Sequence, residues 1–117
     1  MVKTNKDAKA ASKKEQTPRI TKAQAKKFLG RVPEQNAFWC ADGCIFRDIG
    51  ELRDALAGMS DQTFGYHCNL QKKDFSNWIR EVVGDVKLAQ ALETVPNREH
   101  AARILEERCN LLIGKAR

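Results

Sequence analysis

Long apolar runs, aromatic residues and prolines are all scarce in this chain. No apolar stretch approaches the roughly 18 residues that a membrane-spanning helix needs. Aromatic residues make up 7% of the 117 residues, and there are three prolines. The first residues, MVKTNKDAKAASKKEQ, contain neither the apolar segment of a secretory signal nor the arginines of an organelle transit peptide. We therefore expect a cytoplasmic protein with no membrane association.

Positive charge is concentrated near the N-terminus. Residues 1–32 contain ten Lys and Arg but only two Asp and Glu, a net charge of +8, whereas residues 33–117 carry a net −2. Residues 1–19 have almost nothing apolar to bury, so they are expected to form a disordered lysine-rich arm. Without internal repeats, residues 20–117 suit a single compact domain with a modest core.

The apolar periodicity predicts a helix-rich α+β domain, in which one β-hairpin packs on four or five short helices. The hairpin is expected at residues 37–46, AFWCADGCIF, with Gly43 in the left-handed conformation. A weak helix at 22–29 precedes it, and further helices are expected at about 49–58, 75–83, 86–95 and 98–113. The predicted N-caps are Thr21, Asp48, Ser60, Asp74, Asp85 and Asn97.

The same patterns predict which side chains are buried. In the hairpin, Phe38, Cys40, Cys44 and Phe46 share one face, and Trp39 lies on the other. Both tryptophans, Trp39 and Trp78, are expected in the core. The predicted inner stripes of the four later helices are Ile49, Leu52, Leu56 and Met59; Phe75, Trp78, Ile79, Val82 and Val83; Leu88, Ala91, Leu92 and Val95; and Ala101, Ile104, Leu105, Cys109 and Leu112.

The four cysteines raise the question of a metal or redox site. Zinc sites usually pair ligands two residues apart, but three residues separate Cys40 from Cys44. Redox pairs also use two intervening residues, at a helix N-terminus rather than in a hairpin. We expect no metal and no cofactor, with Cys40, Cys44, Cys68 and Cys109 packing as thiols.

His67 and Asp74 are the best candidates for catalysis. A contact between them could form a general base. Alternatively, His67 bonds a loop or helix end and Asp74 caps its own helix. No nucleophile, second carboxylate or Gly-rich phosphate loop accompanies the pair, so we do not expect an enzyme.

Residues 66–92, YHCNLQKKDFSNWIREVVGDVKLAQAL, resemble small, mostly archaeal domains of uncharacterised function. Their pattern runs aromatic-His-x-Asn, then Asn-Asp-Phe-x-x-Trp-Ile/Val, then Gly-Asp-x-x-Leu-Ala, after an aromatic strand ending in Asp-Gly and an acidic capped helix. The resemblance covers about residues 32–95, and Lys73 stands where the pattern has Asn. It implies a fold and no established activity. The matching residues are His67, Asn69, Asp74, Phe75, Trp78, Gly84, Asp85, Leu88 and Ala89.

The lysine-rich N-terminus points to nucleic acid as partner. Phosphate contacts from such an arm carry little sequence preference. The sequence leaves two alternatives: a protein–protein interaction module whose tail only solubilises, and a small enzyme using His67 and Asp74. We also expect that residues 1–27 can be removed without loss of the fold. The candidate nucleic-acid-binding residues are Lys3, Lys6, Lys9, Lys13, Lys14, Arg19, Lys22, Lys26 and Lys27.

Overall fold

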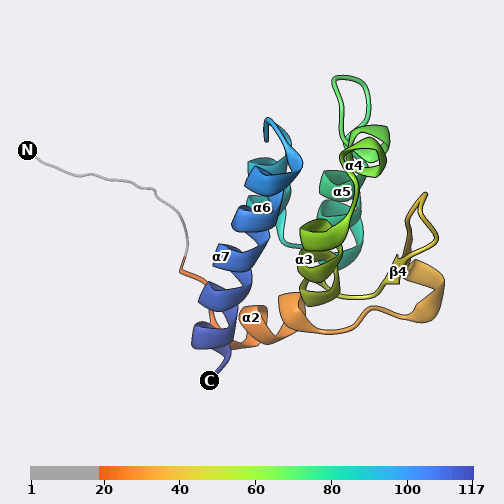
Figure 1. Ribbon diagram of the computed structural model, residues 1–117. Coiled ribbons are helices and arrows are strands. Elements are labelled where there is room, and N and C mark those ends of the chain that lie inside the picture. The colour runs from red at the N-terminus through yellow and green to blue at the C-terminus, as the bar shows by residue number, and fades with distance from the viewer. Residues whose placement is uncertain (1–18) are drawn as a thin grey trace, which may run out of the picture.

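The computed structural model describes residues 19–117. A hairpin of strands β3 (Phe38–Trp39) and β4 (Ile45–Phe46) packs beside a group of helices (Figure 1). The predicted helix-rich α+β class is therefore confirmed. The helices are α2 (Lys22–Leu29), α3 (Ile49–Gly58), α4 (Asp61–His67), α5 (Asp74–Trp78), α6 (Val86–Leu92) and α7 (Arg98–Ala116), with a 3-10 turn η1 (Glu34–Asn36) and a π-helical turn η2 (Ile79–Val83).

Five helices begin at the predicted capping residues. Thr21 and Gln24 form a reciprocal capping box, with side chain to backbone distances of 3.0 and 3.1 Å. This box explains why the weakly apolar helix α2 forms where the sequence predicts it. The other confirmed caps are Asp48, Ser60, Asp85 and Asn97, each of which accepts a backbone N–H three residues later.

The predicted helix at 75–83 differs from the structure in two ways. Asp74 is not its N-cap but its first residue, because its carboxylate is bonded to His67 instead. The second half of the helix is the π-turn η2, in which the Gly84 N–H donates to the carbonyl of Ile79 at 2.7 Å. Gly84 then ends the helix with a φ of 93°. The predicted end at residue 83 is therefore confirmed, whereas the cap is wrong.

The last two helices are shifted from their predicted ends. The helix expected at 86–95 already stops at Leu92, with Glu93 as its C-cap, and Pro96 disfavours helical backbone at Val95. Its inner stripe includes Ala89, which is fully buried, instead of Ala91, which is exposed. The final helix, α7, continues to Ala116 rather than stopping at 113.

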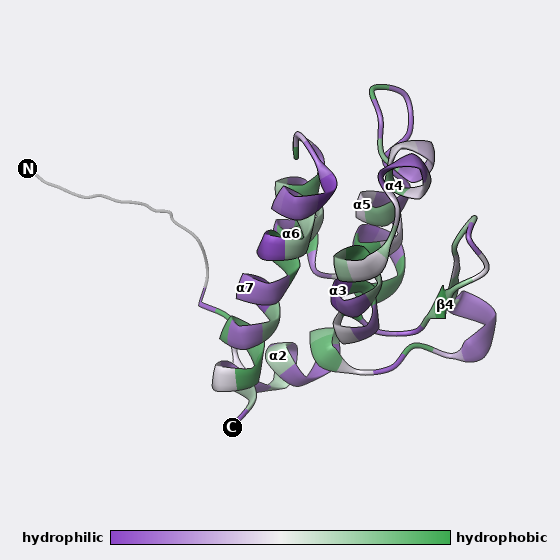
Figure 2. Ribbon diagram, viewed as in Figure 1, coloured by the Kyte–Doolittle hydropathy of each residue, from purple (hydrophilic) through white to green (hydrophobic). Residues whose placement is uncertain are grey.

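Helix α7 is the element around which the core is built. It packs most extensively against α3 and next against α2, although these helices are far from it in sequence. Figure 2 shows apolar and polar residues alternating along these helices, as expected of amphipathic elements. The side chains with no exposed surface are Ala25, Ile49, Leu52, Leu56, Ile79, Ala89, Leu105 and Leu112.

Only one face of the hairpin is covered. Phe38 stacks on Phe46 with ring centroids 4.9 Å apart, and both rings lie edge-on to Trp78. On the opposite face Trp39 is 71% exposed, so the prediction that Trp39 lies in the core is wrong. Cys44 is exposed as well, because it belongs to the turn and β4 begins only at Ile45. Alternation along a strand does not say whether a helix covers its second face.

Candidate functional site

The described part of the basic N-terminus lies on and beside α2. Arg19, Lys22, Lys26 and Lys27 are all exposed, and we call these four residues the α2 basic surface. Lys22 and Lys26 are one helical turn apart, whereas the fully buried Ala25 anchors α2 to the core. The other predicted nucleic-acid-binding residues, Lys3, Lys6, Lys9, Lys13 and Lys14, lie outside the described residues.

Several arginines elsewhere in the described residues pair with carboxylates. Arg31 pairs with Glu51 at 3.0 Å and Arg98 pairs with Asp61 at 3.1 Å. The Arg47 backbone N–H and the Arg31 guanidinium together hold the pKa of Glu51 below its ordinary value. Further ion pairs join Arg53 with Asp54, Arg80 with Glu93, and Arg108 with Asp85.

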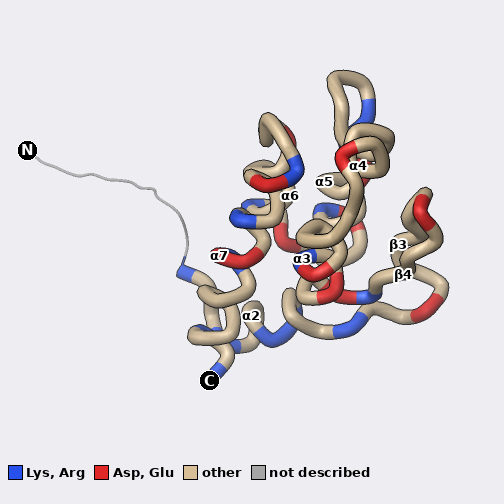
Figure 3. Tube along the Cα trace, viewed as in Figure 1, with Lys and Arg blue, Asp and Glu red and all other residues tan. Residues whose placement is uncertain are grey.

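The α2 basic surface differs from these arginines. Within residues 19–117, none of its four cations forms an ion pair. Figure 3 shows Lys and Arg along α2 and at the nearby C-terminal end of α7. Positive charge without a carboxylate partner therefore gathers at this end of the molecule.

The structure brings His67 and Asp74 together, as the catalytic alternative requires. The Ala41 N–H donates to Nε2 of His67 at 2.9 Å, so Nδ1 must carry the proton, which it donates to Asp74 at 2.9 Å. The ring is 5% exposed and lies against the rings of Phe38 and Phe75. Both ring nitrogens are thus occupied by parts of the fold, an arrangement that suits a structural link between the hairpin, α4 and α5.

Three other residues of the resemblance pattern also make structural hydrogen bonds. Asn69 holds a turn, with its side-chain oxygen accepting the N–H groups of Gln71 and Lys72. Trp78, which is 8% exposed as predicted, donates its indole N–H to the carbonyl of Asn36 at 2.8 Å. Asp85 both caps α6 and accepts two hydrogen bonds from Arg108.

The Asp85–Arg108 pair was missed by sequence reasoning. The Arg108 Nε and Nη2 atoms donate to the two carboxylate oxygens of Asp85 at 2.8 and 2.7 Å. Asp85 is 1% exposed. The only signal in the sequence was the position of Arg108, between the inward-facing Leu105 and Cys109 on α7.

The cysteines are distributed over the fold. Cys40 and Cys109 are buried, as predicted, whereas Cys68 is half-buried and Cys44 is exposed. Desolvation raises the pKa of the Cys40, Cys68 and Cys109 thiols, and a hydrogen bond with Asp42 raises that of Cys44. Nowhere in residues 19–117 do three His, Cys, Asp or Glu side chains converge as metal ligands would.

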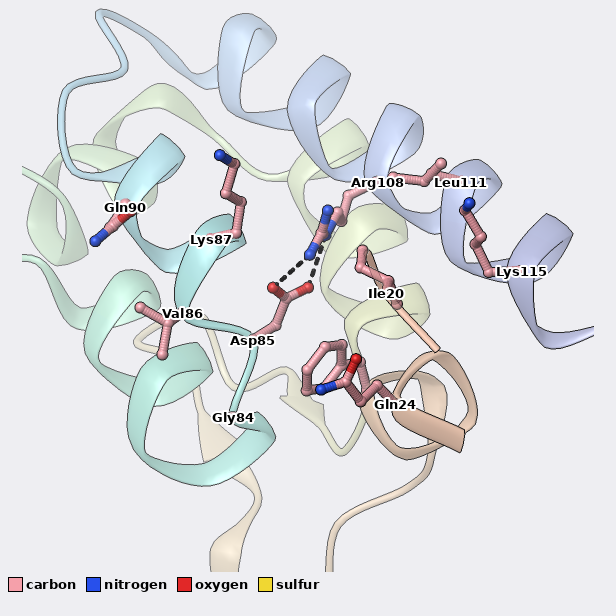
Figure 4. Close-up of a pocket in the computed structure, with 11 residues that line it drawn as sticks. Ile20, Gln24, Gly84, Asp85, Val86, Lys87, Gln90, Arg108, Leu111 and Lys115 are labelled. Atoms are coloured by element: carbon pink, nitrogen blue, oxygen red, sulfur yellow. Dashed lines mark hydrogen bonds and ion pairs between the residues drawn. The ribbon is translucent and has the colours of Figure 1, made fainter. Parts of the chain in front are cut away.

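A pocket of about 660 Å³ lies between α2, α6 and α7 (Figure 4). Its apolar lining comes from Ile20, Phe28, Val86 and Leu111, and its basic lining from Lys87, Arg108 and Lys115. Sequence reasoning did not predict this pocket, because it depends on how three helices distant in sequence come together.

Comparisons with known proteins give no relative for this chain. No protein-family model, no curated protein and no solved structure matches it. The resemblance of residues 32–95 to small archaeal domains remains a prediction. Among residues 19–117, no helix is both long and apolar enough to cross a membrane.

Proposed function

We propose that the protein is a non-enzymatic nucleic-acid-binding protein, whose residues 1–32 contact phosphates with little sequence preference. The observation that supports this proposal is the α2 basic surface, whose cations have no carboxylate partner within the described fold. Five arginines elsewhere in the described residues, in contrast, are paired with carboxylates: Arg31, Arg53, Arg80, Arg98 and Arg108. Exposed lysines of this kind can neutralise phosphates and release the counterions condensed on nucleic acid.

The distribution of charge supports a contribution from both parts of this segment. Residues 1–18 carry five Lys against Asp7 and Glu15, a net +3, whereas residues 19–32 carry a net +5 with no acidic residue. Arg31 is neutralised by Asp48 and Glu51, which leaves the four cations of the α2 basic surface. Because α2 is packed on α7, the backbone that carries the α2 basic surface has a fixed position in the fold. This surface follows residues 1–18 directly in the sequence.

The test is a salt titration of binding to duplex DNA and to structured RNA. Six phosphate contacts on duplex DNA would give a slope of log K against log salt of about −5, and scrambled sequences should bind alike. In the full chain, Lys22→Gln/Lys26→Gln should make this slope shallower by about 2. Changing the five lysines of residues 1–18 to Gln as well should make the slope shallower still.

A matched control removes the same charge elsewhere. Lys72 lies in the loop between α4 and α5, where it pairs with Asp74 at 3.4 Å, and Arg103 lies on α7. Lys72→Gln/Arg103→Gln should leave the slope unchanged. Equal weakening by both double variants would mean that net charge, and not this surface, governs binding. If the full chain binds neither DNA nor RNA at low salt, the proposal is contradicted and the protein–protein interaction alternative is favoured.

A further inference from the structure

The pocket between α2, α6 and α7 combines an apolar lining with a cationic rim. The half-buried Phe28 contributes an aromatic ring, and Ile20, Val86 and Leu111 contribute aliphatic surface. Val86 and Leu111 are 49% and 45% exposed. The lining therefore offers water-accessible apolar surface to a ligand.

The cations around this pocket come from three different helices. Lys87 belongs to α6 and Lys115 to α7, and they flank the Arg108–Asp85 pair (Figure 4). From α2, the Lys27 amine approaches Gly84, where it would lie 3.7 Å from an added Cβ. The single acidic lining residue, Asp85, is neutralised by Arg108, so the pocket has an excess of positive charge.

Lys87 and Lys115 lie on opposite sides of the Arg108–Asp85 pair (Figure 4), and this placement favours a ligand with several negative charges. One carboxylate could meet only one of the lysines, whereas a phosphodiester chain carries a charge on every unit. Its volume of about 660 Å³ also lies within the range of ligand sites, roughly 300–1,000 Å³. Apolar and aromatic surface beside a positively charged track is the arrangement by which proteins hold unstacked bases.

We propose that this pocket holds an unstacked base of single-stranded nucleic acid, with the flanking phosphates on Lys87 and Lys115. The inference rests on the nucleic-acid binding proposed above and adds a preference for single strands. In a duplex the bases stay stacked and paired, and extruding one costs free energy. A single strand can place a base against Phe28 and Leu111 without that cost.

The test compares a labelled oligothymidylate with an abasic strand of the same length, both titrated with the full chain at low salt. The two strands carry the same phosphates, so their difference reports the base alone. The native protein should prefer the oligothymidylate by at least about fivefold, the low end of the effect of base stacking. Leu111→Gln should remove this preference while leaving the affinity for the abasic strand unchanged.

The matched control is Ile113→Gln on the same helix. Ile113 is 38% exposed, a fraction similar to that of Leu111, but it does not line the pocket. The control should keep the full preference, and thermal melting should show that both variants are folded. Lys87→Gln/Lys115→Gln should lower affinity for the single strand more than for duplex, whereas Lys22→Gln/Lys26→Gln should lower both alike.

The possible outcomes separate this inference from the proposed function. Equal affinity for the two strands would overturn the pocket assignment and leave phosphate binding by α2 intact. A base preference that depends on Leu111, together with an overall affinity that does not change in Lys22→Gln/Lys26→Gln, would support the pocket and contradict the role of the α2 basic surface. Absence of binding to any strand would overturn both. Laurate, an aliphatic anion, serves as a second probe. If it binds in a way that depends on Leu111 and the protein shows no base preference, the pocket is a site for an aliphatic anion and the assignment is overturned.

Discussion

His67 joins distant parts of the fold through its two ring nitrogens. Nε2 accepts the N–H of Ala41 in the hairpin turn, and Nδ1 donates to Asp74 at the start of α5. The ring is 5% exposed, whereas the Asp74 side chain is 31% exposed. His67 on α4 therefore links the hairpin turn to α5 through hydrogen bonds.

Replacing this histidine should therefore affect stability. His67→Gln should lower the free energy of unfolding by about 1–3 kcal/mol, because two hydrogen bonds worth about 0.5–1.5 kcal/mol each are lost. Urea denaturation measures the change. His100→Gln is the control, since His100 bonds the capping residue Asn97 through its backbone N–H, which the substitution keeps. A change beyond about 0.5 kcal/mol in the control, or none in His67→Gln, would contradict this role.

At the scale of elements, the helix formed by α5 and η2 depends on how it ends. Gly84 has a φ of 93°, a conformation that residues with a Cβ adopt only at a cost. An added Cβ would meet Lys27 and Phe28 at 3.7–3.9 Å, which is ordinary contact, so the backbone conformation and not a clash sets this cost.

Two glycine substitutions should have opposite effects for this reason. Gly84→Ala should destabilise the protein by about 1–2 kcal/mol. Gly65→Ala, in the middle of α4 with nothing within 4 Å of its added Cβ, should stabilise it by up to about 1 kcal/mol. Thermal melting of the two variants beside the native chain provides the comparison. Destabilisation of equal size by both substitutions would disprove the explanation.

Elements were predictable from the sequence where local chemistry decides them. Caps such as Thr21 and Asn97 act on a backbone N–H three residues away, so a short window of sequence contains both partners. Asp74 was assigned wrongly because its carboxylate has a competing partner, His67, that only the folded chain brings near. Likewise, the apolar pattern of the hairpin could not reveal that Trp39 faces solvent.

At the scale of the whole molecule, the features that matter for function are those between distant segments. The Asp85–Arg108 pair spans 23 residues, and the bond from Trp78 to Asn36 spans 42. The pocket needs α2, α6 and α7 in place together. The charge imbalance, by comparison, was visible in the sequence, because it depends only on composition along the chain.

The position of α2 argues against the expectation that residues 1–27 are removable. Deleting them takes away the fully buried Ala25 and most of α2 from its packing on α7. We expect a loss of at least about 2 kcal/mol, comparable to truncating a buried side chain. Deleting residues 1–18 leaves every described residue in place and should change the free energy of unfolding by less than about 0.5 kcal/mol. Similar destabilisation by both deletions would show that residues 1–18 belong to the folded unit.

The packing of α7 on α2 and α3 also sets the order in which the chain can fold. These contacts join segments near opposite ends of the described chain, so their formation closes a long loop and should be slow relative to helix formation. During synthesis, the apolar sides of α2 and α3 lack their main covering helix until α7 has been made. The nascent chain therefore passes through a stage that exposes apolar surface and is open to aggregation or to capture by chaperones.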